Sequence, residues 1–165
     1  GCTEMEAALM VARELAGKIA DGSIPLQATN GQAALGPQYY AVVALRGISV
    51  SNGAKGPDFF SLSPLYQAAV LRHEYEHVRQ RGGLGILRVM GSNLAQKLAM
   101  LLSRLPGMDE MAWEARGHRW NRTEQEAYAV EKAFLVAAGW GDQGQTPADA
   151  GMLDGLDTWL ADGRK

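Results

Sequence analysis

The sequence predicts an α+β domain in which a small antiparallel sheet packs on a central helix, with further helices around it. Three observations favour this class. A β-branched and aromatic stretch occupies residues 39–51, several other segments carry apolar side chains at helical spacing, and glycine and proline separate the segments. With 165 residues, 47% of them hydrophobic, the chain can bury a full core, and no internal repeat or second domain is evident.

The N-terminal segment, residues 3–20, is expected to be helical. Its apolar side chains recur every three or four residues until the pattern closes near Gly22: Met5, Leu9, Ala12, Leu15, Ala16 and Ile19. The sheet is expected at about 39–62. Its first stretch, 39–51, is broken at Gly47, and residues 58–62 are a further short strand candidate.

The central helix is expected over about 64–81. Ser63 can cap its first turn, and Pro64 suits the first helical position because the missing N–H needs no partner there. Gly82 and Gly83 supply the end. One stripe of this helix should face the core, because its members are spaced by three or four residues: Tyr66, Val70, His73, His77 and Gln80.

A leucine-rich helix is expected at about 84–105, before Pro106. A heptad-like seam runs along it: Leu84, Leu87, Gly91, Leu94, Leu98, Leu101 and Leu105. We expect the seam to pack in the core, and self-association through it is the alternative, since both arrangements use the same spacing. Polar residues such as Arg88 and Lys97 argue against a membrane span.

Two further helices complete the expected domain. Residues 122–138 carry the apolar stripe Ala127, Val130, Phe134 and Ala137. A short helix at about 149–161 should dock through Leu153, Leu156 and Leu160.

Residues 73–77 read His-Glu-Tyr-Glu-His, and this pentad is the most informative feature of the chain. On an α-helix, positions four apart lie within roughly 40° of each other and one turn along the axis, so His73 and His77 can direct their imidazoles at one cation. Glu74 lies beside them and can reach a metal-activated water as a general base without binding the metal. A half-buried histidine pair without a metal is the structural alternative.

A tetrahedral metal site needs a third protein ligand, because the pentad supplies only two. No histidine follows His77 at the position that metzincins use. The helix at about 122–138 offers three carboxylates, those of Glu124, Glu126 and Glu131. If Thr123 caps that helix, Glu126 completes a capping box and Glu124 lies in the first turn, where the helix dipole favours an acid. Asn121 is a competing cap that would place Glu124 deeper in the helix.

The pentad and the segment 124–129 resemble two motifs of the gluzincin family of zinc metallopeptidases. Glu124-Gln-Glu-Ala-Tyr-Ala is similar to the E-x-x-A-D or E-x-x-A-N segment that carries the glutamate ligand, although Tyr128 stands where Asp or Asn is usual. The longer string His73 to Gln80 resembles the H-E-x-x-H-V-x-Q helix of short bacterial zincin domains, some within secreted proteins.

This resemblance implies a zincin-like minimal metalloprotease fold that binds one Zn²⁺ through His73, His77 and Glu124. It also implies hydrolysis of peptide bonds in a peptide or protein substrate, with Glu74 as general base. An edge strand of the sheet would hold the extended substrate. Two alternatives stay open: a zincin-shaped module that binds a metal or partner without turnover, and an interaction domain built on the leucine seam.

The third histidine of the chain, His118, lies in a polar and aromatic segment just before the helix at about 122–138. As a ligand it would give a site of histidines only. We interpret it as a residue at the rim or as a donor to the oxyanion, with an exposed loop histidine as the plain alternative.

The net charge of −2 and the lack of a basic stripe argue against nucleic acid as a partner. The single cysteine, Cys2, excludes an internal disulfide. The Gly1-Cys2 start fits a cloning scar, a natural cut, or an envelope lipoprotein with a lipid anchor on Cys2. The low cysteine content does not by itself distinguish a cytoplasmic from a periplasmic protein.

Overall fold

The computed structural model describes residues 3–30, 39–44, 47–83, 85–103 and 121–138. These residues form an α+β fold with the helices α1 (Glu4–Ala20), α2 (Pro64–Gln80), α3 (Gly85–Ser103) and α5 (Arg122–Ala137). The strands are β1 (Leu26–Thr29), β2 (Ala41–Ala44) and β3 (Gly47–Ser51). The helix expected at about 149–161, together with Cys2 and His118, lies outside the described residues.

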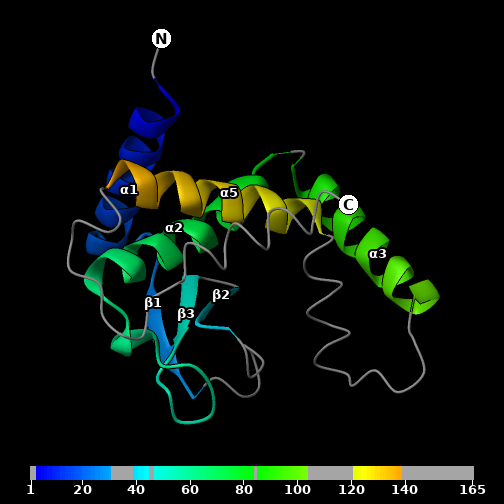
Figure 1. Cartoon of the computed structure of the whole chain (residues 1–165), viewed down its shortest axis with the longest axis horizontal. Coiled ribbons are helices and arrows are strands. Elements are labelled where there is room, and N and C mark those ends of the chain that lie inside the picture. Colours follow the sequence, from blue (N-terminus) through cyan, green and yellow to red (C-terminus); the bar gives the residue numbers. More distant parts are fainter. Residues whose placement is uncertain (1–2, 31–38, 45–46, 84, 104–120, 139–165) are drawn as a thin grey trace.

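The helix α2 is the centre of the fold. Ser63 caps it by accepting a hydrogen bond from the Tyr66 amide, and Pro64 occupies its first turn. One side of α2 contacts β2 and β3, and another packs along α5, so the helix lies between the sheet and α5 (Figure 1). Helix α1 contacts both α2 and α5. Between α1 and α2, the hydroxyl of Tyr75 donates a hydrogen bond to Glu14 at 2.6 Å.

The sheet is mixed, so the expectation of an antiparallel sheet is wrong in part. Strand β3 lies in the middle, antiparallel to β2 with Val43 opposite Ile48, and parallel to β1 with Leu26 opposite Ile48. The chain between β1 and β3 contains β2, and this length allows β3 to return alongside β1 in the same direction. The sheet faces α2 across a core that includes Ile48, Val50, Ala69 and Leu135.

The strand expected at 58–62 is instead a 3₁₀ helix, η1 (Phe59–Ser61). The carboxylate of Asp58 accepts a hydrogen bond from the amide of Phe60, and the hydroxyl of Ser61 donates to the carbonyl of Asp58. These local bonds favour a turn over pairing with a strand. Within the described residues, this segment pairs with another part of the chain through an isolated bridge between Asn52 and Asp58 and forms no longer ladder.

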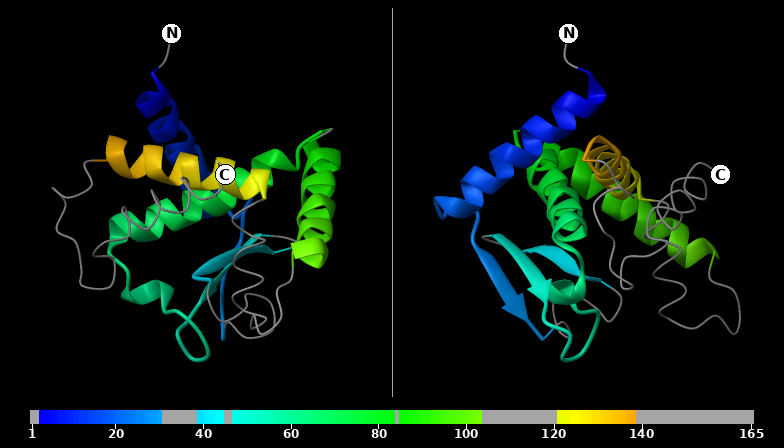
Figure 2. Two further views of the ribbon diagram at one scale, coloured as in Figure 1. Left: turned by 45° about the vertical axis from the view of Figure 1, so that its right-hand side comes forward. Right: turned by 60° about the vertical axis from the view of Figure 1, so that its left-hand side comes forward.

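The leucine seam of α3 is exposed, so its expected packing in the core is wrong for the described residues. Leu87, Leu94, Leu98 and Leu101 are 52–70% exposed, and Val89 and Met100 are the buried apolar residues of this helix. Helix α3 extends to one side of the α2–α5 pair (Figure 2). It contacts α5 through polar side chains, because Asn93 and Gln96 accept hydrogen bonds from Asn121. Within the described part of the chain, no helix has the length and apolar character of a membrane span.

Candidate metal centre

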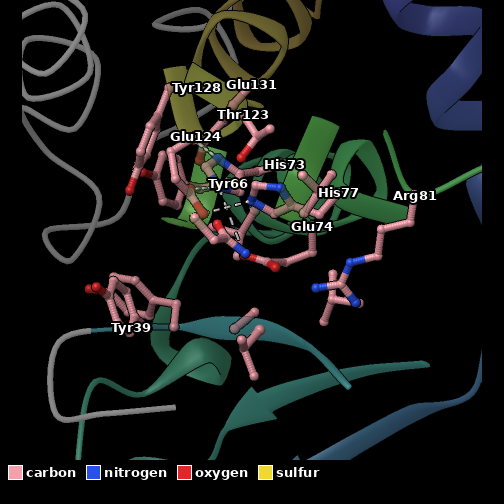
Figure 3. Close-up of a pocket in the computed structure, with 17 residues that line it drawn as sticks. Tyr39, Tyr66, His73, Glu74, His77, Arg81, Thr123, Glu124, Tyr128 and Glu131 are labelled. Atoms are coloured by element: carbon pink, nitrogen blue, oxygen red, sulfur yellow. Dashed lines mark hydrogen bonds and ion pairs between the residues drawn. The ribbon is translucent and has the colours of Figure 1, made fainter. Parts of the chain in front are cut away.

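The side chains of His73, His77 and Glu124 converge between α2 and α5 (Figure 3). The Nε2 atom of His73 lies 3.3 Å from Oε2 of Glu124, and the Nε2 atom of His77 lies 3.2 Å from Oε1 of the same carboxylate. One ligand atom from each residue can be chosen so that all lie within 4.8 Å of one another. The structure therefore brings together the three residues that the sequence nominates, and the group could hold a metal ion.

The donor atoms lie close enough together for a small divalent cation, and zinc is one that these ligand types would suit. Zinc in proteins is bound tetrahedrally by histidine nitrogens and carboxylate oxygens at about 2.0–2.1 Å, which places neighbouring ligand atoms about 3.3 Å apart. The two nitrogen-to-oxygen distances at Glu124, 3.3 Å to Oε2 and 3.2 Å to Oε1, are close to that spacing, and when no metal is bound these atoms are bridged by protons. Two imidazole nitrogens and one carboxylate are also the ligands that zinc accepts in catalytic sites.

Glu124 is positioned by the N-terminus of α5. Asn121 caps this helix by accepting hydrogen bonds from the amide and the hydroxyl of Thr123, so the alternative with Thr123 as the cap is wrong. The amide group of Asn121 donates in turn to Asn93 at 2.9 Å and to Gln96 at 2.7 Å on α3. The side-chain amide of Gln80 on α2 donates to the carbonyl of Thr123 at 3.0 Å, so the first turn of α5, which carries Glu124, is held against both α3 and the central helix.

The two other carboxylates considered as ligands have different partners. Glu126 pairs with Arg88 on α3 and accepts a hydrogen bond from Gln80, so it is directed away from the three converging side chains. Glu131, which is 2% exposed, lies 3.2 Å from the Nδ1 atom of His73, on the opposite side of the ring from Glu124. Glu124 is thus the acid of α5 that lies on the Nε2 side of both histidines.

Both histidines have a hydrogen-bond acceptor on the ring nitrogen that faces away from Glu124. Glu131 accepts from Nδ1 of His73, and Oε1 of Gln80 lies 3.0 Å from Nδ1 of His77. The Gln80 amide nitrogen is directed at the carbonyl of Thr123 and at Glu126, which leaves its oxygen as the acceptor for His77. A proton held on each Nδ1 leaves each Nε2 lone pair available for a metal.

Glu74 lies beside this group on the same helix. It is 8% exposed, and its Oε1 atom lies 3.9 Å from Nε2 of His73. Burial raises the pKa of the Glu74 carboxyl to about 7, and the nearby His73 and His77 oppose that rise. A carboxyl group with this pKa can exchange a proton near neutral pH, as a general acid or base does.

The acids around the two histidines favour the protonated form of both rings when no metal is bound. Burial alone would lower the pKa of His73, but the hydrogen bonds to Glu124 and Glu131 outweigh it and hold that pKa well above its ordinary value. Burial is also the largest single influence on the pKa of His77 and lowers it, but the hydrogen bond to Glu124 and the negative charges of Glu124 and Glu74 together raise that pKa above its ordinary value. The acids around the two histidines thus favour positive charge at this position, as they would favour a bound cation.

These residues line a cleft of about 230 Å³ between α2, α5 and the edge strand β2. Its lining includes Tyr39, Tyr66 and Tyr128 as well as residues 41–43 of β2. The ring of Tyr128 packs edge-on against His73, with ring centroids 4.4 Å apart. Tyr128, which departs from the E-x-x-A-D pattern, thus contacts a candidate ligand histidine through its ring.

The sequence interpretation missed the roles of Gln80 and Glu131. Glu124, Tyr128 and Glu131 are spaced by four and three residues, so they share one face of α5, and this spacing was the signal that could have identified Glu131. Comparisons of the chain with protein-family models, with curated proteins and with solved structures find no match. The site must therefore be judged on its own chemistry.

Proposed function

We propose that the chain is a zincin-like, gluzincin-type metallopeptidase that binds one Zn²⁺ and hydrolyses peptide bonds. The observation that carries the proposal is the position of Glu74, a buried carboxyl that follows the first candidate ligand and lines the same cleft as all three. A metal site with a purely structural role has no need of such a group.

The proposed chemistry divides between the ion and the chain. When bound, zinc supplies Lewis acidity, which polarises a carbonyl and makes a water molecule acidic near neutral pH. His73, His77 and Glu124 would hold the ion, and Glu131 and Gln80 would keep the histidine rings oriented.

Glu74 would take a proton from the attacking water and return it to the leaving amine nitrogen. A group with a pKa near the working pH is suited to both transfers. Hydrolysis of the peptide bond then balances, since water supplies a hydroxyl to the carbonyl carbon and a proton to the amine.

The edge strand β2 supports an extended peptide as the substrate. Residues 41–43 of β2 line the cleft, and within the described residues β2 pairs only with β3, so its other edge has no strand partner. A peptide in extended conformation could add to that edge by main-chain hydrogen bonds, which are independent of sequence. Its scissile bond would then run past Glu74.

The test combines metal analysis with a broad peptide-library digest, read by mass spectrometry with and without a chelator. Glu74→Gln should keep one zinc per chain and lose hydrolysis by roughly 100-fold or more, because the proton acceptor is gone while the ligands stay. Glu124→Gln should lose zinc as well. Glu76→Gln is the control, since it removes an acid of α2 that pairs with Arg72 and Arg79 and does not line the cleft.

Full activity of Glu74→Gln would reject its role as the base. A wild-type chain that binds zinc and cleaves no peptide would instead favour the binding module without turnover.

A further inference from the structure

The cleft has a cationic end formed by Arg81. This residue is the C-cap of α2, and it continues the four-residue spacing of His73 and His77 by one more turn. Its side chain lines the cleft and is exposed. In Figure 3 it extends from the end of α2 toward the sheet, and Glu74 lies between its guanidinium group and Tyr128.

The guanidinium group of Arg81 has no acidic partner among the residues that the structure describes. Arg72 and Arg79 pair with Glu76, and Arg88 pairs with Glu126. Arg13 and Arg122 also have no acidic partner among the described residues, but unlike Arg81 they do not line the cleft. The acids that line the cleft are engaged elsewhere: Glu124 and Glu131 are hydrogen-bonded to the histidines, and Glu74 lies beside His73.

We propose that Arg81 is a specificity-determining residue that binds a substrate carboxylate at this end of the cleft. The inference rests on the proposed peptidase function and names its substrate class, peptides with an acidic group close to the scissile bond. The planar guanidinium group can donate two parallel hydrogen bonds to a carboxylate, a geometry that a lysine cannot reproduce. The acid that the chain does not supply would come from the substrate.

The helix geometry limits where that carboxylate lies in the substrate. One turn of α2 places Arg81 about 6 Å along the axis from His77. A peptide that ran along α2 would advance about 3.4 Å per residue, and this distance would then correspond to about two residues from the scissile bond. The carboxylate has two sources, an Asp or Glu side chain within the peptide or the free C-terminal carboxylate.

The tyrosines at the other end of the cleft give the substrate a direction. Tyr39 and Tyr128 line that end and offer aromatic surface without a cation, so the charged end of the peptide would face Arg81. Peptides whose acidic group lies on the side of the scissile bond that faces the tyrosines should bind more weakly than those whose acidic group faces Arg81. The position of the acid is therefore testable along with its presence.

The experiment measures binding, so that it does not depend on turnover. Zinc-loaded protein carrying Glu74→Gln is titrated into fluorescent hexapeptide libraries, with acetylated and amidated ends, in which one position is fixed as Glu or Gln. A second pair of libraries differs only in a free or an amidated C-terminus, which distinguishes the two sources of the carboxylate. Fluorescence polarisation reports the dissociation constants.

The acidic libraries should bind about fivefold to tenfold more tightly at one position, as expected for a partly exposed charge-assisted pair. Arg81→Gln should bring the ratio near one, Arg81→Glu should favour a library with Lys at that position, and Arg81→Lys should keep part of the preference. The matched control is Arg79→Gln, an exposed arginine that does not line the cleft, and it should keep the whole preference. Zinc content and circular dichroism check each fold.

Equal binding of the Glu and Gln libraries, no binding of either, or a preference that survives in Arg81→Gln would overturn the assignment. These outcomes differ from a failure of the proposed function, which would appear as wild-type protein that cleaves no peptide whatever its charge. If the wild-type chain cleaved neutral and acidic peptides equally well, the proposed peptidase function would stand and the proposed role of Arg81 would be rejected.

Discussion

The carboxyl group of Glu74 couples the stability of the metal-free fold to pH. Its pKa rises from an ordinary 4.5 to about 7 because folding buries it, so between these two values the folded chain binds a proton that the unfolded chain releases. Stability of the metal-free protein should therefore fall as the pH rises through this window and level off, for this group, above about 7. Replacing Glu74 with Gln removes the effect.

The magnitude follows from linkage. One pH unit of difference between folded and unfolded pKa values corresponds to about 1.4 kcal/mol, so the change from 4.5 to about 7 corresponds to about 3 kcal/mol. The raised pKa values of His73 and His77 act in the same direction. Each histidine contributes stability that is fully present below its ordinary pKa of 6.5 and is lost as the pH rises through its folded value.

The assay is urea denaturation of chelator-treated protein at several values between pH 4.5 and 8, for the wild type and Glu74→Gln. We expect the two proteins to have similar free energies of unfolding at the acid end. The Gln variant should be the more stable by up to about 3 kcal/mol at pH 8, with a residual decline due to the histidines. A difference that stays constant across this range would refute the coupling, and so would a variant that is less stable at pH 8.

Two further predictions concern the orientation of the ligands and the core. Glu131→Ala removes the acceptor on Nδ1 of His73 and should weaken zinc binding by about 10- to 100-fold in competition titrations; unchanged affinity would show that the ring needs no such support. Ile48→Ala should lower the free energy of unfolding by about 2–5 kcal/mol in denaturant melts, because Ile48 is fully buried in the sheet; a loss below about 1 kcal/mol would contradict its place in the core.

Local signals in the sequence were sufficient for the helices that the structure describes, α1, α2, α3 and α5, and for two of the three residues of the candidate metal site. Ser63 and Pro64 mark the start of α2, and the structure uses both. The four-residue spacing of His73 and His77 determines that both imidazoles lie on one face, because helix geometry alone fixes it. The choice of Glu124 needed the resemblance to a known segment, since spacing alone does not order three acids on one helix.

The features that sequence could not supply depend on contacts between distant segments. Strand β1 has only four residues, mostly exposed, and no alternating pattern, so its pairing with β3 left no local signal. The leucine seam on α3 could pack in a core or face outward. Its direction is set by Asn93 and Gln96, whose bonds to Asn121 lie on another side of the helix.

The central claim is that His73, His77 and Glu124 bind one zinc ion. The most direct measurement is the anomalous difference density of zinc-loaded crystals, recorded on both sides of the zinc absorption edge. We expect one peak bonded to Nε2 of His73, Nε2 of His77 and the carboxylate of Glu124, at about 2.0–2.2 Å from each. No peak between these side chains, or a zinc ion bound instead by Glu126 or Glu131, would contradict the account.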